Sequence, residues 1–472
     1  MKIKQLLIGL FLTVFAVFAF FPFSEWSILN NIALADEAPS AVKAPTKFPT
    51  INLAGKPSST DTAVHNPDQY AWELFAAVNQ NVPDQFQATS KDGNKTNNVL
   101  WETWADDPLT FPAKPDPANP PQWPGEKPPV KSLRQRSKVE ASQPQFLQFQ
   151  DSAIKDCKAE NNKNTKAQPA PTCEEVRRNY ATFDYIIKNN LWYTEGLAAF
   201  FDTANAKFLT GEKVQKIVDF PKGSIEVKGN WVPITEEQKK DFHWNYDENG
   251  ELYGLIAMHI SSKILPTWFW TTFEWEGNYG RCDYIGCHDQ FGVTPTDVLP
   301  NSTINQKYEK GTLTSNLINL FKEKGLNKEF KHYRLKGAQI AFTDSTGKPN
   351  LLGNSVTESG FVPTASCIGC HARAAITPNG TSAFPVAGFR PSIIGTGQTG
   401  NTAKIGNVEV QLPNGPLVQS YNGTPDPNWY YRIISDQGTL PEKLQSDLIL
   451  DNLQMDFVWA IPINVKSVNS GE

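Results

Sequence analysis

The sequence predicts an α+β protein, with a helical N-terminal part and a mainly antiparallel β remainder. Three patterns support this fold class. Apolar residues recur at helical spacing after the pair Asn66-Pro67, and again within residues 174–192. From about residue 223 onwards, apolar and polar residues alternate in short runs, which is typical of strands. Gly and Asn clusters separate these runs and indicate tight turns.

The N-terminus has the pattern of a secretory signal. Lys2 and Lys4 precede an apolar run at residues 6–21, and the Ala-Leu-Ala at residues 33–35 suits a signal peptidase. We expect cleavage after this tripeptide, which makes residues 1–35 a signal peptide. An uncleaved membrane anchor is the alternative, although the run is shorter than the about 20 residues that a spanning helix needs.

Three regions follow the expected signal peptide. Residues 36–60 are rich in proline, which indicates an extended linker. Residues 61–220 form a helical and loop-rich region, and residues 221–472 form a β-rich region. These last two regions are either separate or parts of one continuous domain.

The clearest helices and strands can be placed within these regions. One helix begins at Pro67, because Asn66 is a good N-cap and proline suits the first helical position, and it stops before Pro83. A second helix is expected over residues 174–192, where apolar residues are spaced by four, three and four positions. The expected strands cover residues 225–228, 252–260, 339–342, 408–412 and 455–461.

The pentapeptide Cys367-Ile368-Gly369-Cys370-His371 is the attachment signature of a c-type haem. Two cysteines three residues apart lie on one face of a helical turn, so both sulfurs can reach the vinyl groups on one edge of a porphyrin. The histidine that follows can bind the iron as proximal ligand. The motif therefore predicts one covalently bound haem c, with Cys367 and Cys370 as thioethers and His371 on the iron.

The position of this motif argues against the small all-α cytochrome c fold. That fold places a helix immediately before the motif, whereas residues 354–366 contain Gly360 and Pro363 and have no helical period. The haem is therefore expected in the β-rich region, residues 221–472.

Four cysteines remain, and an even number suits disulfides in an oxidising compartment. We expect Cys157 to pair with Cys173 across a polar loop, which stabilises the fold by roughly 3 kcal/mol. The sequence favours a second disulfide between Cys282 and Cys287.

Two alternatives to the second disulfide stay open. His288 follows Cys287, and this C-x4-C-H run resembles the long-spacer haem sites of some multihaem cytochromes, so a second haem at Cys282, Cys287 and His288 is one alternative. A zinc site that joins this cysteine pair to Cys367 and Cys370 is the other.

The sixth iron position decides between electron transfer and chemistry at the metal. His259, Met455 and Met258 are candidate sixth ligands. Met258 and His259 are neighbours in an expected strand, so only one of them can face the haem. Met455 aligns with Phe457 and Trp459 on one face of the last expected strand. An open or water-filled position is the remaining alternative.

Other polar residues also have expected positions. Arg373 either contacts a haem propionate or is solvated. The ring of His371 should donate its second N–H to a backbone carbonyl. Residues expected at the surface or in a solvated turn are His65, His243, His332, Glu102, Asp106 and Asp107.

Several segments together resemble a family of large exported cytochrome c family proteins that have a single CxxCH motif. The resembling segments are residues 220–228, 258–260, 268–274, 333–335, 366–374 and 456–459. The resemblance extends over about residues 65–465. It implies haem binding and export, and it leaves the reaction open because this family has no established activity.

These patterns predict an exported c-type haem protein that acts in electron transfer, as a carrier or relay. A haem enzyme or a gas- or peroxide-binding protein with an open iron position is the alternative. The expected location is the periplasm or a thylakoid lumen, and the expected partner is a redox protein of that compartment. The formal charge of −5 argues against nucleic acid as a partner, and no membrane span is expected after signal cleavage.

Overall fold

The computed structural model describes residues 59–125, 128, 131, 133–135, 173–209, 217–301, 306–358, 362–383, 402–405, 408–411, 423–425, 430–433 and 448–469. All of these belong to one unit of the chain, residues 49–472. The expected signal peptide (1–35) and residues 36–58 of the expected linker lie outside the described residues, and so does Cys157.

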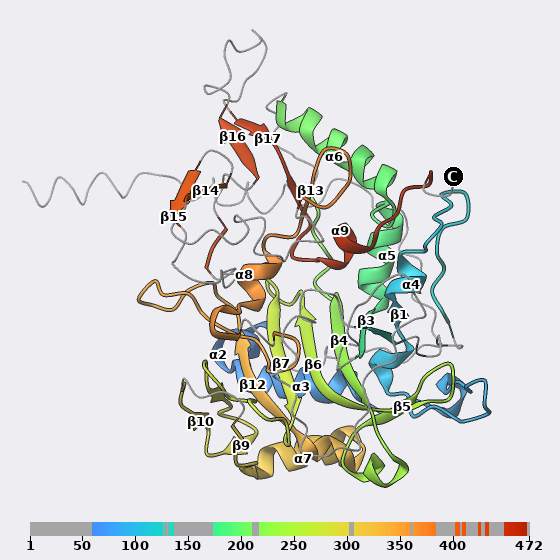
Figure 1. Cartoon of the computed structure of the whole chain (residues 1–472), viewed down its shortest axis with the longest axis vertical. Helices are drawn as coiled ribbons and strands as arrows, with labels where there is room; N and C mark the ends of the chain where they lie inside the picture. Colours follow the sequence, from blue (N-terminus) through green and yellow to red (C-terminus); the bar gives the residue numbers. More distant parts are fainter. Residues whose placement is uncertain are drawn as a thin grey trace, which may run out of the picture. The chain divides into compact units, whose positions relative to one another are not determined.

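An antiparallel sheet of eight strands is the centre of the described fold (Figure 1). Its main path is β1-β3-β4-β6-β7-β12, while β2 pairs with β3 and β5 pairs with β6. The strands are β1 (Ala105–Asp106), β2 (Arg134–Gln135), β3 (Cys173–Arg178), β4 (Ile225–Pro233), β5 (Trp244–Tyr246), β6 (Leu252–Ser262), β7 (Phe269–Trp275) and β12 (Tyr333–Gln339). The fold is therefore α+β with a mostly antiparallel sheet, as predicted, and it is not a small all-α fold.

Helices and five two-stranded pairs make up the rest of the described secondary structure. The helices are α2 (Ser59–His65), α3 (Pro67–Val78), α4 (Asp107–Thr110), α5 (Tyr180–Lys188), α6 (Thr194–Leu209), α7 (Ser315–Lys324), α8 (Cys367–His371) and α9 (Ala460–Asn464). The 3-10 helices are η1 (Asp84–Phe86), η2 (Leu100–Thr103), η3 (Glu236–Lys240), η4 (Lys328–His332) and η5 (Val362–Thr364). The two-stranded pairs are β8 (Cys287–His288) with β10 (Asp297–Val298), β9 (Val293–Thr294) with β11 (Thr312–Leu313), β13 (Ala375–Ile376) with β18 (Leu453–Gln454), β14 (Thr402–Ile405) with β15 (Val408–Gln411), and β16 (Tyr431–Ile433) with β17 (Leu448–Leu450).

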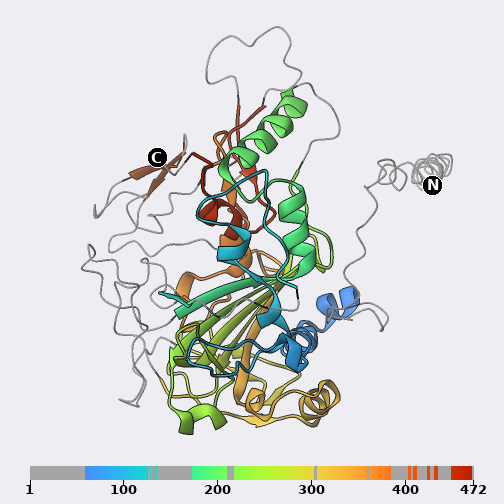
Figure 2. The same cartoon turned by 90° about the vertical axis from the view of Figure 1, so that its right-hand side faces the viewer.

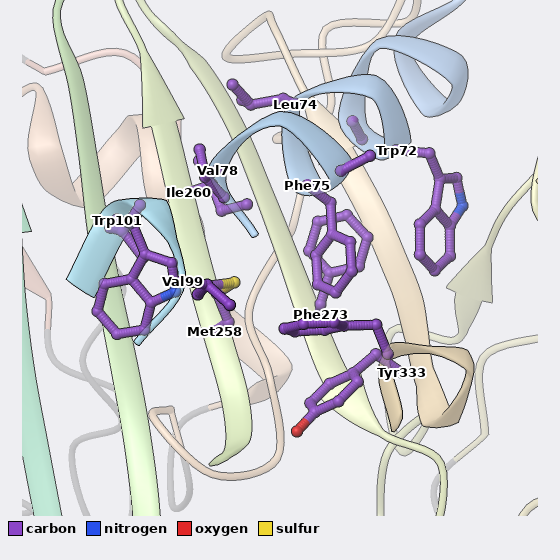
Figure 3. Packing of buried hydrophobic residues seen from close by; sticks show 14 of the residues in the cluster. Trp72, Leu74, Phe75, Val78, Val99, Trp101, Met258, Ile260, Phe273 and Tyr333 are labelled. Carbon is purple, nitrogen blue, oxygen red and sulfur yellow. The ribbon is translucent and has the colours of Figure 1, made fainter. Parts of the chain in front are cut away.

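One face of the sheet is apolar and packs against α3 and α7, which lie on the same side of it (Figure 2). Strand alternation sends Met258 and Ile260 of β6 and Phe273 of β7 to this face. They meet Phe75 of α3, whose ring centroid lies 4.5 Å from that of Phe273 (Figure 3). This apolar cluster anchors the sheet and leaves its other face for a different role.

The opposite face of the sheet is polar, although it too is buried. Asn230, Thr272 and Glu274 are fully buried there. The segment after β12 covers them with matching polar groups: Asn354 donates to Thr272 Oγ1 (2.9 Å), and the Ser355 N–H donates to Glu274 (3.0 Å). A buried polar group is stable only where it is hydrogen-bonded, so this segment is held to the sheet.

A second apolar cluster surrounds the CxxCH segment. It joins Ile368 and Ala372, at and just after α8, to Trp268 and Trp270 beside and in the sheet, and to buried residues between 450 and 461. Segments that are far apart in the sequence therefore pack together around α8.

Three of the expected elements are wrong, and each has a physical reason. Residues 173–178 form strand β3, paired with β4 over six residue pairs, so helix α5 covers only the second half of the expected helix 174–192. The expected strand 339–342 is displaced, because β12 ends at Gln339. The expected strand 455–461 is a turn followed by α9, because Asp456 and Phe457 have φ of 45° and 69°, which no strand allows.

Other expected elements are confirmed. Helix α3 begins at Pro67 and ends at Val78, before Pro83. The strand predictions at residues 225–228, 252–260 and 408–412 correspond to β4, β6 and β15.

Candidate functional site

The CxxCH segment forms the short helix α8. Ser366 caps it, since its hydroxyl accepts a hydrogen bond from the Gly369 N–H (3.2 Å). Ile368 is fully buried and fixes the helix in the second cluster. Cys367 and Cys370 are free thiols, and both are half-buried.

A cavity of about 400 Å³ opens beside these thiols, which is within the range of small-molecule and cofactor sites. Its walls come from strands β1, β3, β4, β6 and β7, from helices α4, α8 and α9, and from the segment before α8. The wall residues nearest in sequence to the motif are Ser366, Cys367, Cys370 and His371, and the others used below are Asp106, Asp107, Glu174, Glu175, Glu226, Lys228, His259, Trp270, Glu358 and Trp459.

His371 is oriented by a backbone carbonyl, as the sequence predicts. Its Nδ1 lies 2.8 Å from the Phe457 carbonyl, so Nδ1 carries the proton and donates. Burial lowers the pKa of His371 to about 4, so the ring is neutral near pH 7. Nε2 has no hydrogen-bond partner in the described part of the chain. The ring therefore offers a lone pair at the cavity wall, which is what an iron ligand requires.

A strained turn supplies that carbonyl. Asp456 and Phe457 both have left-handed backbone conformations, which are costly for residues other than glycine. The turn is held by Lys263, whose Nζ contacts both carboxylate oxygens of Asp456 at 2.6 and 2.7 Å. The Phe220 N–H donates to the same carboxylate (2.8 Å). This buried ion pair thus fixes the carbonyl that orients His371.

The two thiols are protonated. Burial raises the pKa of Cys370 to about 12 and that of Cys367 well above its usual range. The indole of Trp459 donates to the Cys370 carbonyl (3.0 Å), and the Trp270 ring lies 4.5 Å from the ring of His371. Two neutral thiols, a neutral imidazole and aromatic walls on one cavity fit a covalently attached porphyrin.

His259 lies on the same cavity, on the wall formed by the sheet. Its neighbour Met258 points to the opposite face, into the apolar cluster, where Sδ lies 3.7 Å from Asn79 Nδ2. Of these two candidates, the structure therefore places His259 on the cavity wall and Met258 in the core. The strand alternation predicted from the sequence explains this division.

His259 already has polar neighbours on the cavity wall. Nε2 of His259 lies 3.2 Å from Asn354 Nδ2 and 3.4 Å from Glu358 Oε1. Burial opposes ionisation of Glu358, but His259, the Asn354 N–H and Lys228 outweigh it and lower the pKa of this carboxyl to about 2. A charged carboxylate is therefore held beside the imidazole, on the side of the cavity that faces α8.

Met455 does not lie on the described cavity wall. It is fully buried in the second cluster, and its N–H donates to the Ala374 carbonyl (2.8 Å). The expected strand face shared with Phe457 and Trp459 is absent because residues 455–458 form a turn. Arg373 is half-buried, and its guanidinium donates to the Gly369 carbonyl, which ties the end of α8.

Besides Glu358, five carboxylates lie on the cavity wall, of which Asp106 and Asp107 were expected in a solvated turn and the three glutamates were not indicated by any sequence pattern. Asp106, Asp107, Glu174, Glu175 and Glu226 lie on its wall. Paired cations compensate most of them, through contacts of Arg178 with Asp107, Arg177 with Glu175 (2.9 Å) and Lys228 with Glu174 (3.1 Å). Two of them lack such a close partner in the described part of the chain. Asp106 is attracted by Arg177 without an ion pair, and Glu226 Oε2 is buried without a hydrogen bond, 3.8 Å from Arg178 Nε.

The expectation of a solvated turn around Glu102 is wrong. Glu102 is fully buried between Lys131 Nζ (2.6 Å) and His243 Nε2 (2.9 Å). Burial opposes ionisation of Glu102, but these two groups outweigh it and hold its pKa well below the usual range. His243 is fully buried and His332 is partly buried, so only His65 of the three expected surface histidines is exposed.

The remaining cysteines have separate roles. Cys282 and Cys287 form a disulfide with Cα atoms 5.1 Å apart, the pairing that the sequence favours. Their sulfurs are bonded to each other, which favours the disulfide over the second haem and the zinc site. His288 is exposed and contacts Asp297 (2.6 Å) and Asp68 (3.4 Å). Cys173 is also in a disulfide, and its expected partner, Cys157, lies outside the described residues.

Comparisons with known proteins do not identify the chain: no family model, no curated protein and no solved structure matches it significantly. Within the described ranges, no group of three or more His, Cys, Asp or Glu residues could hold a metal ion by itself. None of the helices in the same ranges has the length and apolar character needed to span a bilayer.

Proposed function

We propose that this chain is an exported c-type haem protein that transfers electrons, with haem attached at Cys367 and Cys370 and His371 as the proximal iron ligand. It resembles the large single-CxxCH cytochrome c family proteins, and a redox protein of the periplasm or thylakoid lumen is its proposed partner. The observation that carries the proposal is one cavity lined by both free thiols and by the neutral ring of His371. When bound, the haem would supply a one-electron Fe(III)/Fe(II) couple.

The chain's own residues have defined tasks in this proposal. Cys367 and Cys370 would hold the haem through thioether bonds, and the Phe457 carbonyl keeps Nδ1 of His371 protonated, which leaves Nε2 available to bind iron. Trp270 and Trp459 cover the site and limit water. His259 on the facing wall is the proposed sixth ligand, which favours a low-spin iron suited to electron transfer.

A pyridine haemochrome assay on the exported protein tests the proposal. We expect one haem per polypeptide and a low-spin native spectrum. His259→Ala should convert the spectrum to high spin, while Met455→Leu, a control at the buried alternative ligand, should leave the spin state unchanged. A protein without haem, from a host able to attach it, would refute the proposal.

One observation favours a second function. Nε2 of His259 lies beside Asn354 and Glu358, and a ring retained by those partners would leave the sixth position open. His259 would then act as an acid–base group for a small ligand such as peroxide. A high-spin wild-type spectrum, with His259→Ala slowing peroxide consumption and leaving the spin state unchanged, would support this haem-enzyme alternative over electron transfer.

A further inference from the structure

The disulfide Cys282–Cys287 has an unusual neighbour. The Arg281 guanidinium directs Nη1 at both sulfurs, 3.4 Å from Cys282 Sγ and 3.6 Å from Cys287 Sγ. Disulfide sulfur is a weak acceptor and carries no charge, so these contacts do little to compensate a guanidinium. A thiolate in the same place would be a true counter-ion.

Such a counter-ion would stabilise Arg281, because this residue is buried and forms no ion pair with a carboxylate among the described residues. It is only 4 % exposed, its Nε has no hydrogen bond, and Nη2 donates to the Glu309 carbonyl (3.1 Å). Burial lowers the pKa of this arginine, although arginine stays charged at neutral pH. A buried charge without an ionic partner costs free energy.

The nearest carboxylates are engaged elsewhere. Glu276 is paired with Arg334 and Lys310, each at 2.6 Å, and it also contacts His332 (2.9 Å). Glu274 accepts hydrogen bonds from the Ser355 N–H in the segment that covers the sheet and from the Asn278 amide, both at 3.0 Å. Glu274 and Glu276 attract the Arg281 charge, but neither forms an ion pair with it in the described part of the chain. A thiolate of the reduced pair would lie in direct contact with the guanidinium and would compensate its charge more strongly than the disulfide does.

We propose that Cys282–Cys287 is a redox-active disulfide that exchanges with a dithiol reductant, with Cys282 as the leaving group beside Arg281. Cys287 is half-buried whereas Cys282 is fully buried, so an external thiolate attacks Cys287. A lower pKa of the leaving thiol makes its departure faster, and a neighbouring arginine provides that lower pKa.

The thiol–disulfide exchange takes place in two steps. In the first, the reductant's thiolate forms a bond with Cys287 Sγ, the Cys282–Cys287 bond breaks, and its electron pair leaves on Cys282 Sγ. In the second, the other thiol of the reductant attacks the mixed disulfide and releases Cys287. The reductant becomes a disulfide, the chain gains two electrons, and the reductant's protons pass to Cys287 and to solvent or Cys282. This proposal is independent of the haem.

Redox titration of the full-length protein tests the inference. The protein is equilibrated with mixtures of reduced and oxidised dithiothreitol, quenched with acid and alkylated, and the Cys282 and Cys287 peptides are quantified by mass spectrometry. We expect Arg281→Met to make the pair harder to reduce by about tenfold in the equilibrium constant, which corresponds to about 30 mV. Arg281→Lys, which keeps the charge, should restore part of this difference. An Arg281→Met potential equal to that of the wild type overturns the proposal.

The Cys173 disulfide provides a reference within the same wild-type molecule, which serves even if Arg281→Met does not fold. We expect Cys282–Cys287 to be reduced at a more oxidising potential than the Cys173 disulfide. If the Cys173 disulfide is reduced first, or if both are reduced together, the proposal is wrong.

Discussion

Neighbouring residues of β6 point to opposite faces of the sheet, because successive side chains alternate in direction along a strand. Met258 enters the apolar core, and His259 reaches the cavity that the CxxCH motif borders. The sequence could predict that the two diverge, but it could not predict which one faces the motif. That depends on which face of the sheet the CxxCH segment covers, and this segment is far from β6 in the sequence.

Glu226 should make stability depend on pH in an unusual direction. Burial raises the pKa of Glu226 to about 7, and Asp107 adds to this effect against the attraction of Arg178. The folded state therefore binds the proton more tightly than the unfolded state, whose pKa is near 4.5. The stability that protonated Glu226 contributes is complete below about pH 4.5 and is lost as the pH rises through about 7.

Glu226→Gln should therefore raise the free energy of unfolding at pH 8 by about 3 kcal/mol and change it little at pH 4. Urea unfolding of both proteins at the two pH values measures this difference. Glu236→Gln, at an exposed glutamate, is the control. An equal effect of Glu226→Gln at both pH values would contradict the raised pKa.

The burial of Glu102 and His243 shows what a sequence pattern misses at this scale. Glu102 precedes the acidic pair Asp106-Asp107 and His243 lies in a polar, turn-like stretch, and such contexts normally indicate the surface. Their partners, Lys131 and each other, are separated from them by up to 141 residues, so local composition contains no sign of the pairing. The free-energy cost of burying these charges is offset only in the folded chain, where the partners come together.

Among the elements, α3 was predictable because its start signal is local. The Asn66-Pro67 pair and the apolar spacing after it define the helix without help from the rest of the fold. The expected helix 174–192 failed because a strand and a helix follow each other there, separated by Asn179 as the N-cap of α5. Pairing of β3 with β4 decides the conformation of residues 173–178, and that contact is non-local.

Helix α3 should be a major source of stability. Phe75 is fully buried, and its ring lies among Phe273 (4.5 Å), Phe330 (5.7 Å) and Tyr333 (6.0 Å). Phe75→Ala removes these contacts and leaves a cavity, so the free energy of unfolding should fall by about 3–5 kcal/mol in urea titration. Val64→Ala in α2, an exposed position, should change it by less than about 0.5 kcal/mol. Similar losses for both variants would show that α3 does not anchor the sheet.

At the scale of the whole described fold, the cavity lies between the polar face of the sheet and the segments around α8 and α9. This placement explains why the sheet keeps a buried polar face, which an ordinary core would not need. The CxxCH motif could be recognised from five residues of the sequence. The walls could not, because they come from residues as distant as Asp106 and Asn464.

Loss of the thiols should loosen one side of the fold and spare the other. In the proposed haem protein, Cys367→Ala/Cys370→Ala prevents covalent attachment and leaves the cavity without its occupant. Hydrogen exchange measured by mass spectrometry should then rise in residues 352–358, 362–383 and 448–469. Residues 67–78 of α3, which lie in the apolar cluster, serve as the internal control and should keep their protection. Unchanged exchange around α8 would argue against an occupant in the wild type.

The turn that orients His371 also limits how early, during synthesis of the chain, the site can be complete. The carbonyl of Phe457 follows His371 by 86 residues, and the Lys263–Asp456 pair spans 193. At typical rates of synthesis, residue 457 is added roughly 4–17 s after residue 371. Until residue 457 is present, the carbonyl that orients the imidazole is missing. His371 is therefore synthesised before the residues that orient its ring.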